Sequence, residues 1–224
     1  MNKVFSFTNK ETIYRRCILA STIHAVMNGR FEDFAGEQSW DGMNYSFQNF
    51  EGIRGTINFC DERFVCAVRN DKNYIAGEDE ILNFFFRNAD KKTLDIAADI
   101  TLQYLLTDEK GNDVPAVSVA FWGNKENIFS NQQENEINEK SEGILLPLFY
   151  EEADALKYWK EYNDLNDESD NDKIDFIMEI YNKRINTGDR IVLDKLMKDK
   201  LVFWFGDNID ECIISFEELN VFFE

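Results

Sequence analysis

The sequence predicts an α+β fold in which mostly antiparallel strands are flanked by helices. Residues 53–60 (IRGTINFC) and 64–70 (FVCAVRN) flank a short polar turn and alternate in the manner of half-buried strands, which is the pattern of a β-hairpin. Strands and helices do not alternate regularly along the chain, which argues against a parallel, doubly wound sheet. An apolar content of 44%, with 20 Phe among the 224 residues, is enough to build a buried core.

The N-terminal part is predicted to contain a strand, a helix and a loop. Residues 3–7 have the composition of a short strand, and Thr8 and Glu11 have the spacing of a capping box at the start of a helix that extends to about Asn28. Apolar side chains recur every three or four residues in this helix, which predicts one buried face. Residues 31–52 lack a helical period, so we expect a loop with a strand at 44–50.

Five helices and three strands are expected in the remainder. Helices are predicted at 78–87 and 91–106, followed by a turn at 108–113, and the apolar run 116–122 (AVSVAFW) predicts a buried strand. Further helices are predicted at 151–163 and 173–185. The chain is then expected to form strands at 200–205 (KLVFWF) and 211–215 (ECIIS), separated by a turn at 206–208, and a short helix that begins at Ser215.

The polar stretch 124–142 is the predicted domain boundary. We expect an N-terminal α+β domain at 1–123, a polar linker at 124–142 and a C-terminal α+β domain at 143–224. A single domain is the alternative, because 224 residues can also form one core.

The charge of the chain restricts its partners. With 43 acidic and 24 basic side chains the net charge is -19, which repels phosphate backbones and anionic membranes. We therefore expect neither nucleic acid nor a membrane as a partner. Residues 1–30 carry a net charge of +4, which leaves -23 for the remainder, so a basic protein would be attracted to the later part of the chain.

The four cysteines, Cys17, Cys60, Cys66 and Cys212, have no disulfide-framework spacing and are interpreted as reduced thiols. This composition indicates a soluble, cytoplasmic protein. Polar residues interrupt the apolar run at 17–27, which favours a helix packed on a core over a secretion signal.

No motif for catalysis, a cofactor or a metal is recognisable, and we expect none of the three. Cys17 and His24 share a helix face, but their Cα atoms would be roughly 10 Å apart, too far for a nucleophile and its base. Residues 164–175 match a calcium loop only in its first three ligand positions. Ser169 replaces the glycine of the turn and Asp175 the bidentate Glu, so a solvated linker is favoured over weak calcium binding.

The segment 31–50 contains the candidate recognition residues. Aromatic anchors within an acidic rim are typical of a protein-binding surface. The candidates are Glu32, Asp33, Glu37, Trp40, Asp41 and Tyr45. One alternative is that the aromatic residues close the core, and another is that Glu37 and Asp41 beside Trp40 form a sugar site. An exposed Trp40 would favour the partner surface, and a buried Trp40 would favour the core.

Several phrases resemble bacterial proteins. AVSVAFWGNKENIFS, followed by a polar segment and GILLPLF, resembles an uncharacterised bacterial family. LPLFYEEADALKYW, RIVLDKLMKDKLVFWFGD and SFEELNVFF are similar to small bacterial modules suspected to be toxin-immunity proteins. Together they cover about half of the chain and include no motif of known chemistry. The resemblance implies a bacterial origin and a role in binding another protein.

These observations lead to an expected function. The chain is interpreted as a protein-binding module of the immunity or inhibitor type that acts on a basic, toxin-like partner. Two alternatives stay open: a small enzyme with an unfamiliar carboxylate or cysteine site, and a nucleic-acid mimic that blocks a DNA-binding protein through its carboxylates.

Overall fold

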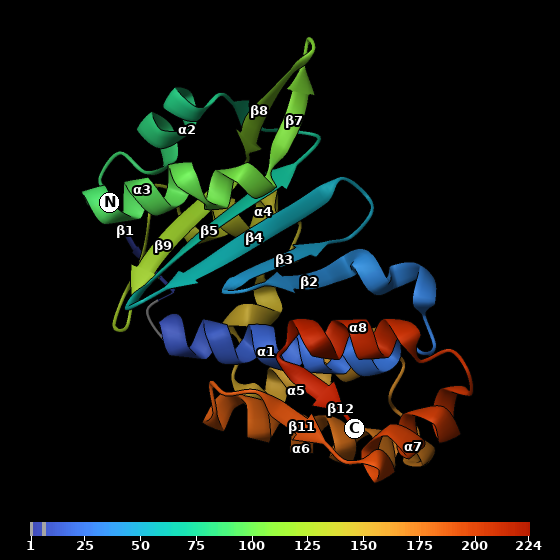
Figure 1. Cartoon of the computed structure of the whole chain (residues 1–224). Helices are drawn as coiled ribbons and strands as arrows, with labels where there is room; N and C mark the ends of the chain where they lie inside the picture. The colour runs from blue at the N-terminus through green and yellow to red at the C-terminus, as the bar shows by residue number, and fades with distance from the viewer. Residues whose placement is uncertain (1, 6–7) are drawn as a thin grey trace. The chain divides into compact units, whose positions relative to one another are not determined.

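The computed structural model describes residues 2–5 and 8–224, and the chain forms two compact units (Figure 1). The first unit consists of residues 1–14 and 41–149, and the second of residues 15–40 and 150–224. Two elements contain residues of both units, namely α1 (Lys10–Met27) and β2 (Gln38–Asp41). The predicted α+β class is confirmed.

The first unit contains most of the strands. Its strands are β1 (Asn2–Val4), β3 (Asn44–Gln48), β4 (Ile53–Cys60), β5 (Arg63–Asn70), β6 (Ile75–Ala76), β7 (Leu106–Glu109), β8 (Asn112–Val117), β9 (Val119–Asn124) and β10 (Ile128–Ser130). Its helices are α2 (Glu78–Phe85), α3 (Lys91–Asp99), η2 (Thr101–Tyr104), α4 (Glu134–Lys140) and η3 (Leu146–Phe149).

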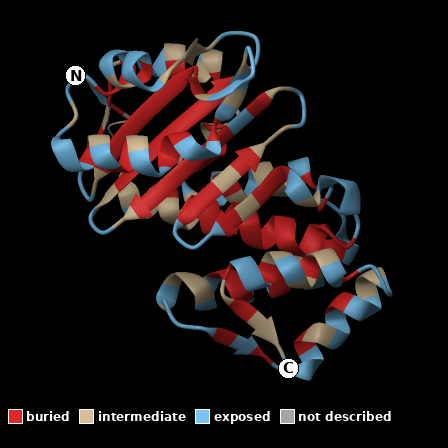
Figure 2. Cartoon of the chain, turned by 45° about the horizontal axis from the view of Figure 1, so that its top comes forward, coloured by how far each residue is buried: buried red, intermediate tan, exposed pale blue. Residues whose placement is uncertain are grey.

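A seven-stranded sheet has the order β1-β10-β9-β5-β4-β3-β2, and the pairs from β1 to β3 are antiparallel. The predicted hairpin is confirmed as β4 and β5, with Cys60 opposite Arg63 at the turn. Helices α2 and α3 cover one face of β5 and β9, where Phe86 and Ile96 pack in a cluster with Val65 and Trp122. Figure 2 shows these central strands as almost wholly buried.

Side chains continue the ladder where the main chain of β10 ends. Gln132 is buried, and its Oε1 accepts from the Ala120 amide at 3.1 Å while its Nε2 donates to the Ser118 carbonyl at 3.0 Å. The Ser130 hydroxyl donates to the Ala120 carbonyl at 2.7 Å. The buried main-chain groups of Ser118 and Ala120 are thus satisfied without a further strand residue.

The second unit is mainly helical. Its elements are α1 from Arg15 onward, η1 (Glu32–Glu37), α5 (Glu152–Tyr162), η4 (Glu168–Asp170), α6 (Asn171–Asn186), β11 (Ile191–Leu193), α7 (Lys195–Phe205), α8 (Asp210–Glu218) and β12 (Val221–Phe223). Strands β11 and β12 pair in parallel.

Contacts between distant segments hold this unit together. The side-chain Nδ2 of Asn28 donates to the Ser215 hydroxyl at 2.8 Å, and the ring of Phe216 packs edge-on against Phe176. A Cβ atom at Gly29 would lie 2.5 Å from the ring of Phe205, so a glycine is required for this close approach. Residues 15–40 therefore cannot form this unit without residues 150–224.

The two C-terminal strand predictions are wrong. Residues 200–205 lie in α7 and residues 211–215 in α8. Asp194 caps α7 by accepting from the Met197 amide, and Met197 and Leu201 are buried at a spacing of four residues. A cap and a helical period thus determine the structure despite the β-forming side chains. The helix expected from Ser215 is the last part of α8.

Several other predictions need correction. Helix α1 is buried on all sides from Arg16 onward, so it resembles a central core helix with no polar face. Asn9 caps it, accepting from the Thr12 amide, in place of Thr8. Of the strand expected at 3–7, residues 6 and 7 lie outside the described residues.

The remaining differences concern loops and boundaries. The predicted loop 31–52 contains η1 and β2 as well as the expected strand, and the predicted turn 108–113 is the end of the β7–β8 hairpin. The predicted strand 116–122 is interrupted at Ser118 between β8 and β9. The predicted linker 124–142 contains β10, which pairs with β9 and β1, so this stretch belongs to the first unit.

Candidate functional site

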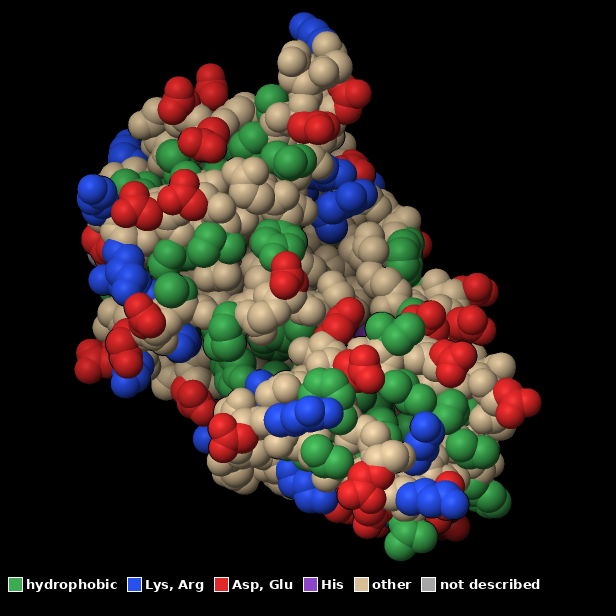
Figure 3. Space-filling model, viewed as in Figure 1, with side chains coloured by type: hydrophobic (Ala, Val, Ile, Leu, Met, Phe, Trp, Pro, Cys, Tyr) green, Lys and Arg blue, Asp and Glu red, His purple; other side chains and the backbone are tan. Residues whose placement is uncertain are grey.

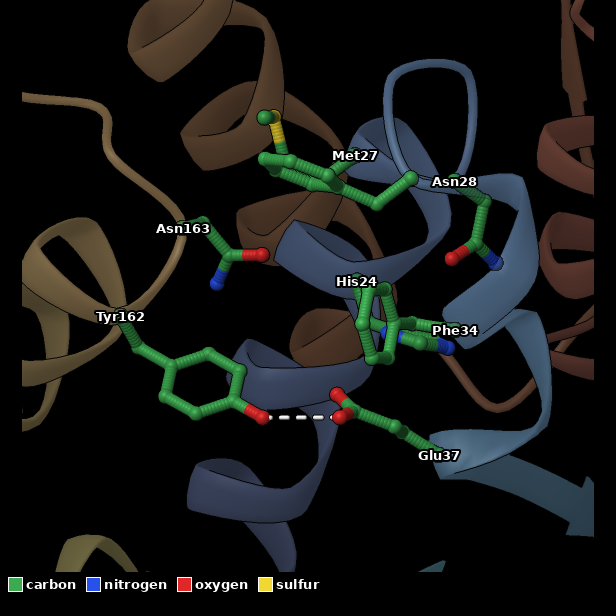
Figure 4. Close-up of a pocket in the computed structure, with 8 residues that line it drawn as sticks. His24, Met27, Asn28, Phe34, Glu37, Tyr162 and Asn163 are labelled. Atoms are coloured by element: carbon green, nitrogen blue, oxygen red, sulfur yellow. Dashed lines mark hydrogen bonds between the residues drawn. The ribbon is translucent and has the colours of Figure 1, made fainter. Parts of the chain in front are cut away.

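A pocket in the second unit gathers buried polar groups and aromatic rings (Figure 4). Its volume is about 160 Å³. The lining residues come from α1, from η1 and the residues between these two helices, and from the end of α5: His24, Met27, Asn28, Phe31, Phe34, Glu37, Tyr162 and Asn163. The pocket thus joins segments that are more than 120 residues apart in the sequence.

The end of α5 fixes one side of the pocket. Asn163 is the C-cap residue, and its main-chain amide and its Nδ2 both donate to the Trp159 carbonyl, at 3.1 Å and 2.9 Å. The next residue, Asp164, has a φ of 55°, which turns the chain away from the helix. The Asn163 side chain is therefore held in place, with its Oδ1 directed toward the middle of the pocket in Figure 4.

Glu37 supplies the carboxylate of the pocket. The Tyr162 hydroxyl donates to its Oε1 at 2.9 Å (Figure 4). Burial raises the pKa of Glu37, and the hydrogen bond from Tyr162 opposes this effect. Glu37 is thus a buried acid that one hydroxyl group orients.

His24, which lies on α1, lines the same pocket as Glu37 (Figure 4). Its Nε2 is 3.0 Å from the Ala35 carbonyl oxygen, which can only accept, so Nε2 carries the proton. Burial lowers the pKa of His24, although the bond to Ala35 opposes the shift. The imidazole is therefore neutral near pH 7, with Nδ1 as its acceptor atom.

Charged and aromatic groups form the rim. Arg30 pairs with Asp164 at 2.9 Å, and its guanidinium lies 5.0 Å from the centre of the Phe31 ring. The side chains of Phe34 and Tyr162 are about half exposed, at 47% and 52%. The pocket therefore opens to solvent between aromatic rings.

The predicted recognition residues are not gathered into one surface. Glu32 and Asp33 are exposed on η1, whereas Glu37 lies in the pocket. Trp40 is buried, with Nε1 donating to the Ser21 hydroxyl at 2.8 Å. By the criterion set above, the interpretation of Trp40 as an exposed anchor is corrected in favour of the core.

Asp41 and Tyr45 belong to the first unit. Asp41 accepts from the Tyr104 hydroxyl at 2.7 Å, and this bond raises the pKa of Tyr104 to about 12. Tyr45 is 2% exposed and packs against Phe47, so it offers no ring to a partner. Since Trp40 is also buried, no exposed indole serves as the wall of the proposed sugar site.

The cysteines are structural in character. None of the four takes part in a disulfide among the described residues, and three of them, Cys17, Cys66 and Cys212, are buried. Burial raises the pKa of Cys66 well above its usual value and that of Cys212 to about 12. These thiols are therefore protonated near pH 7 and weakly nucleophilic.

The possible calcium segment does not form an open loop. Residues 168–170 form η4 and α6 begins at Asn171, while Asp164 pairs with Arg30 and Asp170 with Lys173. Within residues 2–5 and 8–224, no three His, Cys, Asp or Glu side chains are grouped so that they could hold a metal ion.

A second hollow, of about 460 Å³, lies in the first unit. It is lined by Ile75, Asp79, Glu80, Asn83 and Phe84. Both acids are exposed on the first turn of α2, and Phe84 is 53% exposed. The hollow is thus a feature of the surface, and among the described residues its two acids have no hydrogen-bond or ion-pair partner of the kind that orients Glu37 in the other pocket.

The carboxylates of residues 151–179, here named the acidic segment, distinguish this part of the second unit. The segment has eleven Asp or Glu residues and three Lys residues. Ion pairs engage five of the acids: Glu152, Glu161, Asp164, Asp170 and Glu179. The other six are exposed, without an ion pair in the described part of the chain: Glu151, Asp154, Asp167, Glu168, Asp172 and Asp175. On the face drawn in Figure 3, acidic and basic side chains are intermingled.

Sequence reasoning did not single out Tyr162 or Asn163. The only sequence signal is their position at the end of the predicted helix 151–163, next to Asp164. Nothing in that pattern predicts the contact with Glu37, which lies 125 positions earlier.

Comparisons with protein-family models, curated proteins and solved structures gave no match for this chain. Among the described helices, none combines the length and the apolar character needed to cross a membrane.

Proposed function

We propose that the protein is a binding module of the immunity or inhibitor type, which recognises a basic protein partner through the acidic segment. The observation that carries the proposal is a set of six exposed carboxylates between Glu151 and Asp175 that form no ion pair with any residue the structure describes. In such a set each charge is available to a partner, whereas paired surface charges are partly neutralised by their neighbours.

The proposal also has an energetic basis. The segment contributes a net charge of -8 within a chain of net charge -19. A concentrated negative field can increase the association rate of a cationic protein by about 10 to 10³ fold. Salt weakens this effect, because at an ionic strength of 0.1 M the electrostatic attraction is screened beyond a distance of about 10 Å. An inhibitor of this kind acts by rapid binding and steric blockade, and needs no catalytic group.

The resemblance of LPLFYEEADALKYW to suspected immunity modules supports the same proposal, since this phrase includes the start of the acidic segment. A bacterial origin and a toxin-like partner follow as part of the proposal. The partner would be encoded close to the gene for this chain and would be active in the same cytoplasm.

The test compares two variants that change the net charge equally. The test variant neutralises four unpaired acids of the acidic segment: Asp154→Asn, Glu168→Gln, Asp172→Asn and Asp175→Asn. The matched control neutralises four exposed acids of the first unit: Asp95→Asn, Asp99→Asn, Asp113→Asn and Glu126→Gln. The association rate with the purified basic product of a neighbouring gene is measured by stopped flow at several salt concentrations.

The test variant is expected to associate at least tenfold more slowly at low salt and to lose most of its salt dependence. The control is expected to retain most of the rate, because its charges lie outside the acidic segment. Equal rates for the two variants would show that the acidic segment is not the recognition surface. A neighbourhood that encodes no basic protein bound by this chain would overturn the proposal.

A further inference from the structure

We propose that the pocket formed by His24, Glu37 and Tyr162 receives the side chain of a lysine from the basic partner. This inference rests on the proposed function, because it identifies the group of the partner that enters the site. Tyr162 and Asn163 lie within residues 151–179, so one side of the pocket comes from the same stretch of chain as the six exposed carboxylates.

The size of the pocket suits one side chain. Its volume of about 160 Å³ is close to that of a cavity of roughly 150 Å³ that holds benzene. Pockets for drug-sized ligands usually measure about 300 to 1,000 Å³. Four methylene groups and an ammonium fit the smaller volume, whereas a nucleotide or another large cofactor does not.

The walls suit a cation on an apolar stem. The rings of Phe31, Phe34 and Tyr162 line the pocket together with Met27. Aromatic faces attract ammonium groups within about 6 Å, most strongly where water is excluded. The methylene groups of a lysine would contact the same rings and the thioether.

Two oxygen acceptors are available for the ammonium group. The Glu37 carboxylate accepts one hydrogen bond from Tyr162, and an ionised carboxylate can accept about four. The Oδ1 atom of Asn163 points inward (Figure 4), since the Nδ2 atom is held by the Trp159 carbonyl. A lysine ammonium has three donors, so these two acceptors and one water would satisfy it.

The charges around the pocket favour a cation. His24 is neutral near pH 7 because burial lowers its pKa, so it does not repel an ammonium. Arg30 is paired with Asp164 at the rim, and this pair contributes little net charge. The buried Glu37, with its raised pKa, gains a counter-ion when an ammonium enters, which favours its ionised form.

The location fits a binding hot spot. A central anchor residue in a desolvated pocket contributes strongly to affinity, while the surrounding charges determine the association rate. We therefore expect the acidic segment to attract the partner and the pocket to hold one of its lysines.

The experiment uses the full chain and no partner. N-acetyl-lysine N-methylamide is titrated and followed by NMR or calorimetry, with N-acetyl-norleucine N-methylamide as a probe of nearly equal shape without the charge. Millimolar binding of the lysine probe is expected, at least tenfold tighter than that of the norleucine probe. Glu37→Gln, which keeps an acceptor for Tyr162, is expected to weaken lysine binding at least tenfold.

The matched control is Glu32→Gln, because Glu32 is an exposed glutamate on the same 3-10 helix. It removes one charge without touching the pocket, and lysine binding is expected to change by less than twofold. Phe34→Leu tests the aromatic wall at a half-exposed position where the fold tolerates substitution, and weaker lysine binding is expected.

Four outcomes would overturn the inference. Equal binding of the two probes would show an apolar pocket without an ammonium site, and equal losses in Glu37→Gln and Glu32→Gln would show only a general charge effect. Binding of free n-butylammonium without binding of the lysine probe would identify a site for small amines instead. If the lysine probe does not bind but the acidic-segment variant still slows association with the partner, the inference fails and the proposed function stands.

Discussion

The buried amide of Gln132 gives a sharp prediction about the central sheet. The Gln132 side chain forms hydrogen bonds with the main-chain amide of Ala120 and the main-chain carbonyl of Ser118. Both groups belong to the first unit and lie beyond the point where β10 ends. Gln132→Leu keeps the approximate volume but removes both partners. We expect this substitution to destabilise the first unit much more than an ordinary surface change.

The magnitude follows from the two groups that are left unpaired. An unsatisfied buried donor or acceptor costs about 1–3 kcal/mol. The two groups together cost about 2–6 kcal/mol, and the added apolar surface of leucine offsets about 1–2 kcal/mol. The difference of the two ranges is a net loss of about 0–5 kcal/mol in the free energy of unfolding, with a central expected value of about 2–3 kcal/mol.

Chemical denaturation followed by circular dichroism measures the loss, and hydrogen exchange of the Ala120 amide reports the local effect. Faster exchange at Ala120 is expected in the variant. Gln103→Leu is the control, since Gln103 is exposed, and its effect is expected to stay within about 0.5 kcal/mol. A loss below about 0.5 kcal/mol for Gln132→Leu, with unchanged exchange at Ala120, would show that water or a rearranged strand replaces the amide.

Three further predictions concern packing, pH and thiol reactivity. Gly55→Ala would place a methyl group 2.3 Å from the Phe47 ring, so a loss of about 1–3 kcal/mol is expected in denaturation, partly recovered by Phe47→Leu in the same chain. Burial lowers the pKa of His24 in the folded state, so its contribution to stability is complete above its pKa in the unfolded chain, about 6.5, and is lost as the pH falls through the folded-state pKa. Below pH 6.5 the free energy of unfolding should therefore depend less on pH in His24→Gln than in the native chain. Parallel plots of the free energy of unfolding against pH for the two proteins would contradict this. Cys66 and Cys212 should react with a thiol reagent such as DTNB only after unfolding, and rapid reaction of either in the native protein would contradict their burial.

The β4–β5 hairpin could be predicted from sequence because its information is local. Two runs of β-forming residues flank a polar turn, and Asp61 adopts the left-handed conformation at that turn, with a φ of 46°. Helix α6 was predicted for a similar reason, since its apolar residues recur at a helical period. Patterns of this kind depend only on neighbouring residues.

Helix α7 shows where local patterns mislead. The phrase KLVFWF is rich in β-forming side chains, yet Phe203 within it is 85% exposed and only one of its six side chains, Leu201, is buried. The deciding signal was Asp194 as N-cap, seven residues before Leu201 and outside the apolar run. Aromatic content alone is a weak predictor, because β-propensity reflects packing as much as backbone preference.

The candidate site was only partly predictable. Glu37 was singled out for its aromatic and acidic neighbours in the sequence, but in the structure its partner is Tyr162. His24 was considered in the sequence as a base for Cys17, and in the structure it lines the pocket together with Glu37. Which residues of α5 meet η1 depends on tertiary packing, and no spacing rule extends across 125 residues.

The division of the second unit into residues 15–40 and 150–224 also affects its biosynthesis. During translation, residues 15–40 leave the ribosome more than a hundred residues before the helices that complete their unit. Their apolar surface stays exposed to solvent or bound to a chaperone until the last helices have been synthesised. If residues 150–224 were expressed alone, the apolar surface that packs against residues 15–40 would be exposed. A fragment intended to contain the pocket must therefore also include residues 15–40.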